Sequence, residues 1–296
     1  MVIESVNQYL QLIELLQEKY KYTIHGNGLI PDQTIPTNFI FRGHGDKNSY
    51  KLIPGIFRMK EIEKGKSIGE FSQLEFAVLS DFISEACGLV NEIHTSDTVP
   101  WLEIAQHYGV PTRLLDFSDN PLVALFFACV DSPEKEASVW IIDGNAYNRK
   151  FYSNVPTFNP VFSDLNVHKI VADEIINQNF QLHSFENGYL PFPWIYKPFY
   201  RNQRMISQSS IFMIWASERY ELTYFMNPEN YMTDDPTIEN RETGILCELT
   251  IPYMNKKELL KQLEMCGINE KFIYPGLDGI GRFIRNKYSY KRLLQY

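Results

Sequence analysis

Hydrophobic residues recur at helical spacing in several stretches of the chain. Val6, Leu10 and Ile13 predict a first helix over about residues 5–19. The same periodicity predicts a helix from Phe71 to about Cys87, with Glu75 on its flank. Further helices are predicted over residues 101–108, from Asn120-Pro121 onward and over 258–266. The helix that opens at Pro121 continues as LVALFFACV, so we expect it to be buried nearly all round.

Shorter apolar runs bounded by turn residues predict strands at 38–42, 138–143, 209–216 and 244–251. Residues 144–203 are rich in aromatic residues, Pro and Asn, and are densest in YLPFPWIYKPFY at 189–200. We interpret this stretch as a long connection folded over the core, with a ligand lid or a protein contact as the alternatives. The pattern as a whole predicts one compact α+β domain in which helices flank a mixed central sheet.

The 296 residues carry a formal net charge of −8, which argues against a broad footprint for duplex nucleic acid. Arginines nevertheless gather in and beside the motifs described below. A focused cationic pocket in an acidic chain indicates a small anionic ligand, such as a nucleotide, as the partner. The arginines are Arg42, Arg58, Arg113, Arg201 and Arg204.

No run of eighteen apolar residues occurs, and the N-terminal run has neither a basic region nor a cleavage site. We therefore expect a cytoplasmic protein without a membrane partner. The cysteines are scattered singly and predict reduced core thiols, with neither a disulfide framework nor a metal site. They are Cys87, Cys129, Cys247 and Cys266.

Two blocks carry the candidate chemistry. The first, FIFRGHGDKNSYKLIPGIFR at 39–58, places Arg42 at the end of an apolar strand, followed by Gly43 and Gly45, which we expect to turn the backbone with positive φ. The second, WLEIAQHYGVPTRLLDFSDNPLVALFFAC at 101–129, places five polar residues on a tight segment between two apolar helices. These residues are His107, Tyr108, Thr112, Arg113 and Asp116.

Together the two blocks resemble the FRG domain family, named for Phe41-Arg42-Gly43. RMISQSSIF at 204–212 is similar to a third family element, and the segment 251–284 is similar to its closing segment. The resemblance implies a single FRG-type domain over 1–296. Its expected parts are a helical lead-in at 1–36, core motifs at 37–143, an aromatic and Pro-rich insertion at 144–203, and core strands and a helix at 204–296.

Arg42 could clamp a phosphate or a carboxylate, or could form an ion pair with Asp116 or Glu75. His44 belongs to the turn after Arg42 and is expected to touch the same ligand. His107 could carry a proton or bind an anion, with a helix-capping role as the alternative.

Other polar residues have structural alternatives of the same kind. For Arg113 and Asp116 we favour a mutual pair that holds the turn over a ligand role. Arg204 and Gln208 are predicted to share one face of a strand and form a site wall, with a satisfied cross-strand hydrogen bond as the structural alternative. Asp278 is predicted to cap a helix.

A strand that ends in aromatic-Arg-Gly also resembles the first motif of the arginine-bearing ADP-ribosyltransferases. That resemblance implies an ADP-ribosyltransferase-like fold in which Arg42 meets the phosphates of NAD, a serine-bearing strand supports the nicotinamide ribose, and a Glu on a later strand polarises the ribose. Residues 207–210 are only loosely similar to the serine motif. Glu248 could supply the carboxylate, or Gln208 could stand at that position without the charge.

Three hypotheses follow. The first is an NAD-using or nucleotide-using transferase or glycohydrolase, in the setting of a toxin or phage-defence effector, with NAD as substrate and no other cofactor. Its candidate catalytic residues are Arg42, His107, Gln208 and Glu248, and its ligand-binding residues are Gly43, His44, Tyr108, Thr112, Arg113, Asp116 and Arg204. The second is a noncatalytic sensor of an anionic ligand that uses the same cleft. The third is a protein-interaction module that works through residues 189–200.

Overall fold

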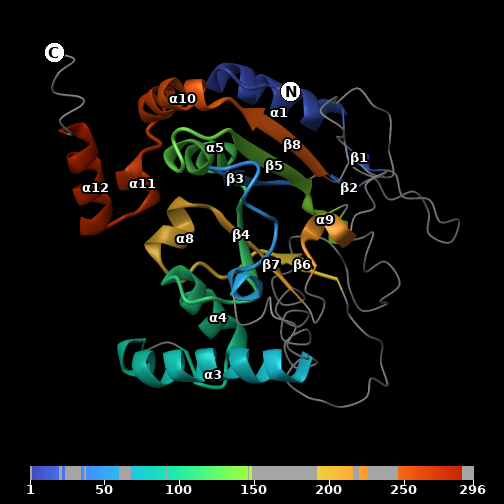
Figure 1. Ribbon diagram of the computed structural model, residues 1–296, viewed down its shortest axis with the longest axis vertical. Coiled ribbons are helices and arrows are strands. Elements are labelled where there is room, and N and C mark those ends of the chain that lie inside the picture. The colour runs from blue at the N-terminus through green and yellow to red at the C-terminus, as the bar shows by residue number, and fades with distance from the viewer. Residues whose placement is uncertain are drawn as a thin grey trace, which may run out of the picture.

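The protein was analysed as a computed structural model, and Figure 1 shows how its elements are arranged. The structure describes residues 2–19, 22–23, 35–36, 38–59, 68–90, 93–145, 147–148, 192–215, 220–225 and 246–288. Most of the insertion predicted at 144–203 lies outside these residues. The domain boundaries predicted from the sequence stay predictions.

A six-stranded sheet forms the centre of the fold, with its strands in the spatial order β6-β7-β4-β3-β5-β8. The chain enters it at β3 (Phe39–His44), β4 (Leu114–Ser118) and β5 (Ala137–Asp143), and completes it with β6 (Trp194–Tyr196), β7 (Ser210–Ile214) and β8 (Leu246–Ile251). All five pairings in this sheet are antiparallel, where a mixed sheet was predicted. The parallel contact found in the described residues is an isolated bridge from Val2 to Thr250. Two short strands, β1 (Tyr22–Thr23) and β2 (Ile35–Pro36), pair separately.

Alternate residues of the strands separate the two faces of the sheet. One face packs as a single core around Ile40, Leu115, Phe117 and Met213, covered by the short helices η1 (Gly55–Arg58) and α9 (Leu222–Phe225). The opposite face carries two cores side by side. The core on β3, β5 and β8 contacts α1 (Val6–Lys19), α5 (Pro121–Val130) and α10 (Tyr253–Met265). The core on β4, β7 and β6 contacts α3 (Ile68–Ala86) and α4 (Thr98–His107).

The remaining described elements are η2 (Cys87–Leu89), α8 (Gln203–Ser207), α11 (Glu270–Ile273) and α12 (Leu277–Lys287). The helices and the four strands expected from the sequence are present, and the α+β class is confirmed. Strand β4 was not predicted, because its polar neighbours were interpreted as a turn between helices. The α5 start is as expected, since Asn120 caps it by accepting from the Leu122 backbone N–H at 2.9 Å.

Three local predictions were wrong. Arg204 and Gln208 lie on helix α8 and at its C-terminal cap, not on a strand, so their four-residue spacing is one helical turn. Gly276 and not Asp278 occupies the N-cap of α12, and Asp278 lies in the first turn. Of the four cysteines expected in the core, Cys129 and Cys247 are buried, whereas Cys87 and Cys266 are exposed.

Gly43 is required by a close approach of helix α5 to strand β3, not by the positive φ that the sequence suggested. Among the described glycines, positive φ occurs at Gly109, Gly267 and Gly276. A Cβ at Gly43 would lie 2.0 Å from the Ala124 carbonyl oxygen and 2.6 Å from the Ala128 nitrogen. The glycine therefore lets α5 lie directly on the strand that carries Arg42.

Lys256 of α10 fixes the end of α5 to the turn after β3. Its buried ammonium donates to the carbonyl oxygens of Gly45 at 2.7 Å, Ser132 at 2.8 Å and Asp131 at 2.9 Å. These carbonyls come from two separate loops, so one cation joins them. Lys256, far along the chain, thus fixes the positions of residues 43–45 and 131–132 relative to each other.

We predict that Gly43→Ala lowers the free energy of unfolding by about 3 kcal/mol or more, because the clash is with backbone atoms of α5 that cannot move independently. Urea unfolding measures the change. Gly281→Ala is the matched control, because Gly281 lies on helix α12 and a Cβ there has no neighbouring atom within 4 Å. Replacing this helical glycine by alanine should raise the free energy of unfolding by about 0.5–1 kcal/mol. Equal effects of the two substitutions would contradict the close-approach explanation.

Candidate functional site

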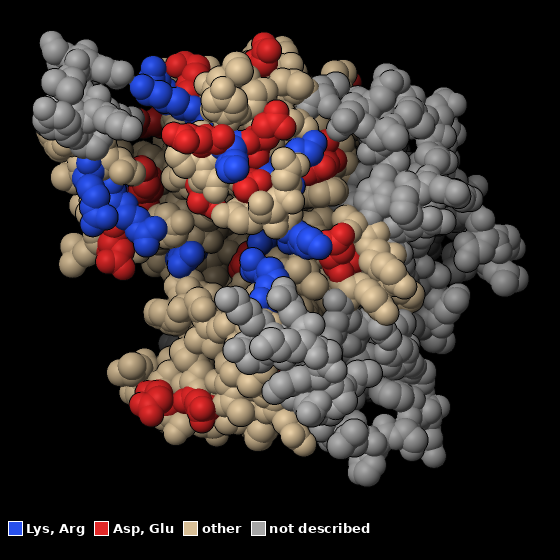
Figure 2. Space-filling view, in the orientation of Figure 1, with Lys and Arg blue, Asp and Glu red and all other residues tan. Residues whose placement is uncertain are grey.

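A pocket opens where strands β3 and β4 part. The two strands are paired at Phe41 and Ser118, and no further pair joins them in the direction of Gly43 and His44. The parted strands leave a cavity of about 440 Å³ between the two cores of the same sheet face. Figure 2 shows a hollow across the middle of the molecule with Lys and Arg side chains at its rim.

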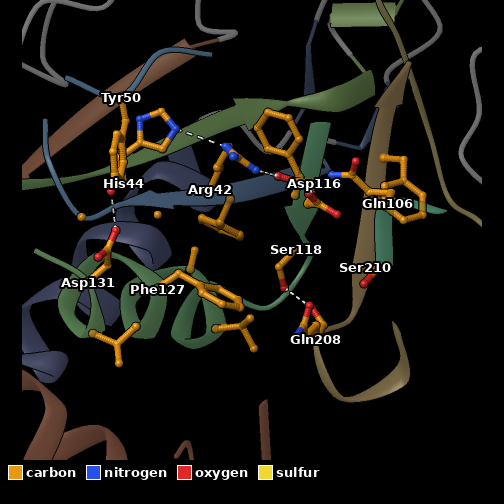
Figure 3. A pocket seen from close by; sticks show the side chains of 18 of the residues that line it. Arg42, His44, Tyr50, Gln106, Asp116, Ser118, Phe127, Asp131, Gln208 and Ser210 are labelled. Carbon is orange, nitrogen blue, oxygen red and sulfur yellow. Dashed lines mark hydrogen bonds between the residues drawn. The ribbon is translucent and has the colours of Figure 1, made fainter. Parts of the chain in front are cut away.

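Arg42 fills part of the gap between the strands (Figure 3). Its Nη1 donates to the backbone oxygen of Asp116 on β4, and its Nε donates to His44 Nε2 at 3.1 Å. A guanidinium has five N–H donors, so the described contacts leave Nη2 available. Burial lowers the pKa of Arg42 to about 10, and the group therefore stays charged at neutral pH. The pocket thus contains a fixed cation with donors to spare.

His44 holds this arginine from the other side as a neutral ring. Burial first, and then the nearby Arg42 and Arg58, lower the pKa of His44 to about 3. Because Nε2 accepts from Arg42, the ring proton lies on Nδ1. That buried Nδ1 has no partner among the described residues. The neutral ring therefore positions the Arg42 guanidinium by acting as a hydrogen-bond acceptor.

Further cations surround Arg42, and the acids are fewer. Arg58, Lys51 and Arg204 also line the pocket. Arg204 donates to the His107 carbonyl at 3.3 Å, and burial, followed by the charge of Arg204, lowers the pKa of His107.

The pocket carboxylates among the described residues are Asp116 and Asp131. Asp116 is exposed and accepts from Gln106 Nε2 at 2.5 Å, while Asp131 accepts from the Tyr50 hydroxyl at 2.6 Å. The surplus of cations over acids makes the pocket suited to an anion.

Serine and glutamine form the opposite side of the pocket (Figure 3). Ser118, at the end of β4, donates to the backbone oxygen of Gln208 at 2.6 Å and is paired across the sheet with Ser210. The Gln208 side chain donates from Nε2 to the Ile273 carbonyl at 3.0 Å. Its Oε1 is a pocket acceptor without a described hydrogen bond. The polar side chains here are neutral, in contrast to the Arg42 side.

Aromatic rings complete the lining. Phe127 projects from α5 into the pocket, and its ring lies edge-on to that of Tyr274 at a centroid distance of 6.4 Å. The guanidinium of Arg204 lies 4.9 Å from the Tyr274 ring centroid, and that of Arg282 lies 4.6 Å from it. Apolar rings beside an anion-binding cation are the combination that a nucleotide needs, because its base is flat and apolar on both faces while its phosphates are charged.

Seven of the eleven candidate catalytic and ligand-binding residues meet in this pocket, although they come from different elements. They are Arg42, Gly43, His44, His107, Asp116, Arg204 and Gln208. Glu248 lies outside the lining, on β8, where its carboxylate is 3.7 Å from Lys47 Nζ. Tyr108 and Thr112 are also absent from the lining. Tyr108 is exposed, and the buried Thr112 donates to Gln106 Oε1 at 2.7 Å.

Arg113 is fully buried and does not line the pocket either. It binds Glu75 of α3 through two parallel hydrogen bonds, one of them 2.7 Å from Nε to Oε1, and donates to the Trp215 carbonyl at 3.2 Å. The predicted pair of Arg113 with Asp116 is therefore wrong, as is the placement of Glu75 on a helix flank. The same contact leaves Glu75 unavailable to Arg42.

Several lining residues were not predicted. Four of them are polar residues in or next to the recognised motifs, and their polarity could have marked them as site candidates. They are Tyr50, Gln106, Ser118 and Ser210. Phe127 and Tyr274 gave no signal, because an aromatic residue in an apolar helix or a turn has the pattern of a core residue. Only the parting of the two strands exposes them to a common cavity.

The aromatic segment at 189–200 has a structural role where the structure describes it. Trp194 and Tyr196 belong to the edge strand β6 and are buried, whereas Phe199 is exposed. Substitution of Trp194 or Tyr196 would therefore test the fold and not a protein contact. Residues 189–191 lie outside the described residues.

Comparison with known proteins identifies an FRG domain over residues 37–137. The chain therefore carries an FRG domain, which spans β3, α3, α4, β4 and α5 and reaches the start of β5. Neither the curated proteins nor the solved structures contain a match to this chain. None of the described helices is long and apolar enough to span a membrane. The described residues contain no group of three His, Cys, Asp or Glu side chains placed to hold a metal ion.

We predict that Glu75→Gln destabilises the fold by about 3–5 kcal/mol, because it leaves the buried Arg113 charge without its carboxylate. The double variant Glu75→Leu/Arg113→Met should be more stable than Glu75→Gln, since both charges are then removed. Urea unfolding of the two variants and the wild type measures the difference. A double variant that is less stable than Glu75→Gln would contradict this assignment.

The depressed pKa of His44 predicts a pH dependence of stability. Between the unfolded pKa of about 6.5 and the folded value of about 3, the unfolded chain binds the proton and the folded chain does not, so stability is lost as the pH falls through this window. His44→Gln keeps an acceptor for Arg42 but cannot titrate. Below about pH 6, the wild type should lose about 1.4 kcal/mol per pH unit more than His44→Gln. Parallel pH profiles of the two proteins would refute the neutral, buried histidine.

Proposed function

We propose that the pocket binds NAD or a related nucleotide and that the chain is an ADP-ribosyltransferase-like or glycohydrolase-like enzyme. The observation that carries this proposal is Arg42 in the gap between β3 and β4, with Nη2 left without a described hydrogen bond in the pocket. A phosphate accepts several hydrogen bonds and is bound well by a planar guanidinium. The neighbouring Arg58 and Arg204 would bind further phosphate oxygens.

Three positions around the pocket support the comparison with ADP-ribosyltransferases. The resemblance requires an arginine at one strand end, a serine strand and a residue on a later strand that contacts the ribose. Arg42 on β3 and Ser118 on β4 correspond to the first two positions, and Gln208, at the C-terminal cap of α8, lies in the same cavity two residues before β7. Ser118, not the segment 207–210 by itself, is then the residue of the serine strand.

Cleavage of NAD would break the bond between the nicotinamide nitrogen and the ribose, with the electron pair leaving on nicotinamide. The cationic ribose that develops needs a carboxylate or another acceptor nearby. Asp116 is the candidate in this pocket, because it is exposed there and adjacent to Arg42. An NAD-consuming activity would suit the toxin or phage-defence role expected from the sequence, since NAD loss stops cell metabolism.

A noncatalytic sensor is the second candidate function. The observation that favours it is the amide of Gln208 at the position where the resemblance requires an acid. An amide oxygen can accept a hydrogen bond from a ribose hydroxyl but carries no full charge to stabilise the developing cation. The same pocket would then bind the nucleotide without turning it over.

We predict that purified protein incubated with NAD, ATP or GTP is stabilised in a thermal-shift assay by at least one of them. Mass spectrometry detects any release of nicotinamide. Arg42→Lys should weaken binding by about ten-fold or more, because a lysine keeps the charge but loses the planar, paired donors. Arg201→Lys is the matched control, since Arg201 lies outside the pocket, 3.7 Å from Glu103.

Turnover and binding are separated by two further variants. Asp116→Asn should abolish nicotinamide release and leave stabilisation by NAD if the chain is an enzyme. If the wild type only binds, Gln208→Glu tests whether restoring an acid creates turnover. Absence of binding to all three nucleotides, in a wild type that unfolds cooperatively, would overturn the proposed function.

A further inference from the structure

Helix α12 presents its apolar stripe to solvent. Leu277, Ile280 and Ile284 follow one another at helical spacing and are 86%, 47% and 46% exposed. An amphipathic helix of a globular protein ordinarily turns such a stripe to the core. In α12 the apolar stripe faces solvent instead.

The opposite face of α12 is the one that packs on the fold. A Cβ at Gly279 would lie 1.8 Å from the Tyr274 carbonyl oxygen and 2.7 Å from that of Glu270. On the same side, Asn286 Nδ2 donates to Glu270 Oε1 at 2.6 Å. Gly279 thus docks the helix through backbone contact and fixes the apolar stripe outward.

Cationic residues border this stripe. At helical spacing Arg285 and Lys287 lie on the two sides of the stripe, whereas Arg282 lies on the opposite face, with its guanidinium 4.6 Å from the Tyr274 ring centroid. The helix has a single acid, Asp278, in a chain whose net charge is −8. Figure 2 shows Lys and Arg side chains gathered along the left edge of the molecule, where Figure 1 places α12. Tyr288 is exposed directly after the helix, and the sequence continues with Lys291 and Arg292, which lie outside the described residues.

We propose that α12 docks on an anionic lipid bilayer, lying in the plane of its surface. A helix with an apolar stripe, low mean hydropathy and flanking Lys and Arg inserts its apolar side chains at the boundary of the headgroups, while its cations bind anionic lipids. With α12 on the bilayer, the acidic remainder of the protein would lie away from the anionic lipids. The expectation of no membrane partner rested on the lack of a spanning segment, which this mode of binding does not need.

A second copy of the chain fits the same surface less well. An eleven-residue helix is about 16 Å long, so its outer face falls well short of the roughly 800 Å² per partner that a stable dimer buries. Pairing two such faces would also bring their bordering cations together. A lipid surface, by contrast, complements both the apolar and the cationic residues.

Co-sedimentation of the full chain with vesicles tests the proposal. The protein should pellet with phosphatidylcholine vesicles that contain phosphatidylglycerol and stay in solution with phosphatidylcholine alone, and added salt should weaken the binding. Ile280→Ser/Ile284→Ser should abolish pelleting. Arg285→Glu/Lys287→Glu should reduce partitioning at least about twenty-five-fold, because each cation near an anionic surface contributes about five-fold.

Two controls separate the lipid contact from unfolding and from nonspecific attraction. All variants should keep the wild-type unfolding temperature, since the replaced side chains are exposed. Leu89→Ser and Lys257→Glu change comparably exposed positions on other elements and should leave pelleting unchanged. Wild type that stays in solution with anionic vesicles would overturn the proposal. So would a dimer in light scattering that Ile280→Ser/Ile284→Ser converts to monomer, because the stripe would then bind a second copy.

Discussion

The bond from Arg42 to the Asp116 carbonyl is the interaction on which the site depends. Strands β3 and β4 stop pairing after Phe41 and Ser118, so a strand carbonyl would lose its partner at the centre of a sheet. The Arg42 guanidinium supplies the donor that the parted strand no longer provides. The same group keeps the strands apart and brings a positive charge into the opening. One side chain therefore both bridges the parted strands and places a positive charge in the pocket.

The three residues that name the FRG domain have three separate physical roles. Phe41 is buried in the core under α5, Arg42 bridges the parted strands, and Gly43 lets α5 lie on the strand backbone. Next to them, His44 accepts from Arg42 through a ring that burial keeps neutral. Arg42 thus contacts both β4 and His44, and Gly43 sets how closely α5 approaches the same strand. The motif is therefore one coupled unit.

Hydrophobic periodicity predicted the helices and most strands because those elements bury one continuous face. It could not predict β4, since the polar residues at 112–116 are satisfied by distant partners. Arg113 finds Glu75 on α3, and a pair 38 residues apart leaves no local pattern. Arg204 and Gln208 were placed on the wrong element for a related reason, because a four-residue spacing fits one helical turn and two strand repeats equally well. The polar pocket residues could be recognised in the sequence as candidates. That they lie together in one pocket follows from the strand order, which the sequence did not reveal.

The pocket is assembled from both sides of the matched region. The FRG domain at 37–137 supplies Arg42, His44 and Asp116, which form the cationic end. Arg204, Gln208, Ser210 and Tyr274 lie beyond it in the sequence and form the opposite end. Arg42 joins two strands of the sheet, whereas the second group lies on a short helix, a strand end and a turn. The matched domain thus supplies the residues at the parting of β3 and β4, and the segments beyond it complete the pocket lining.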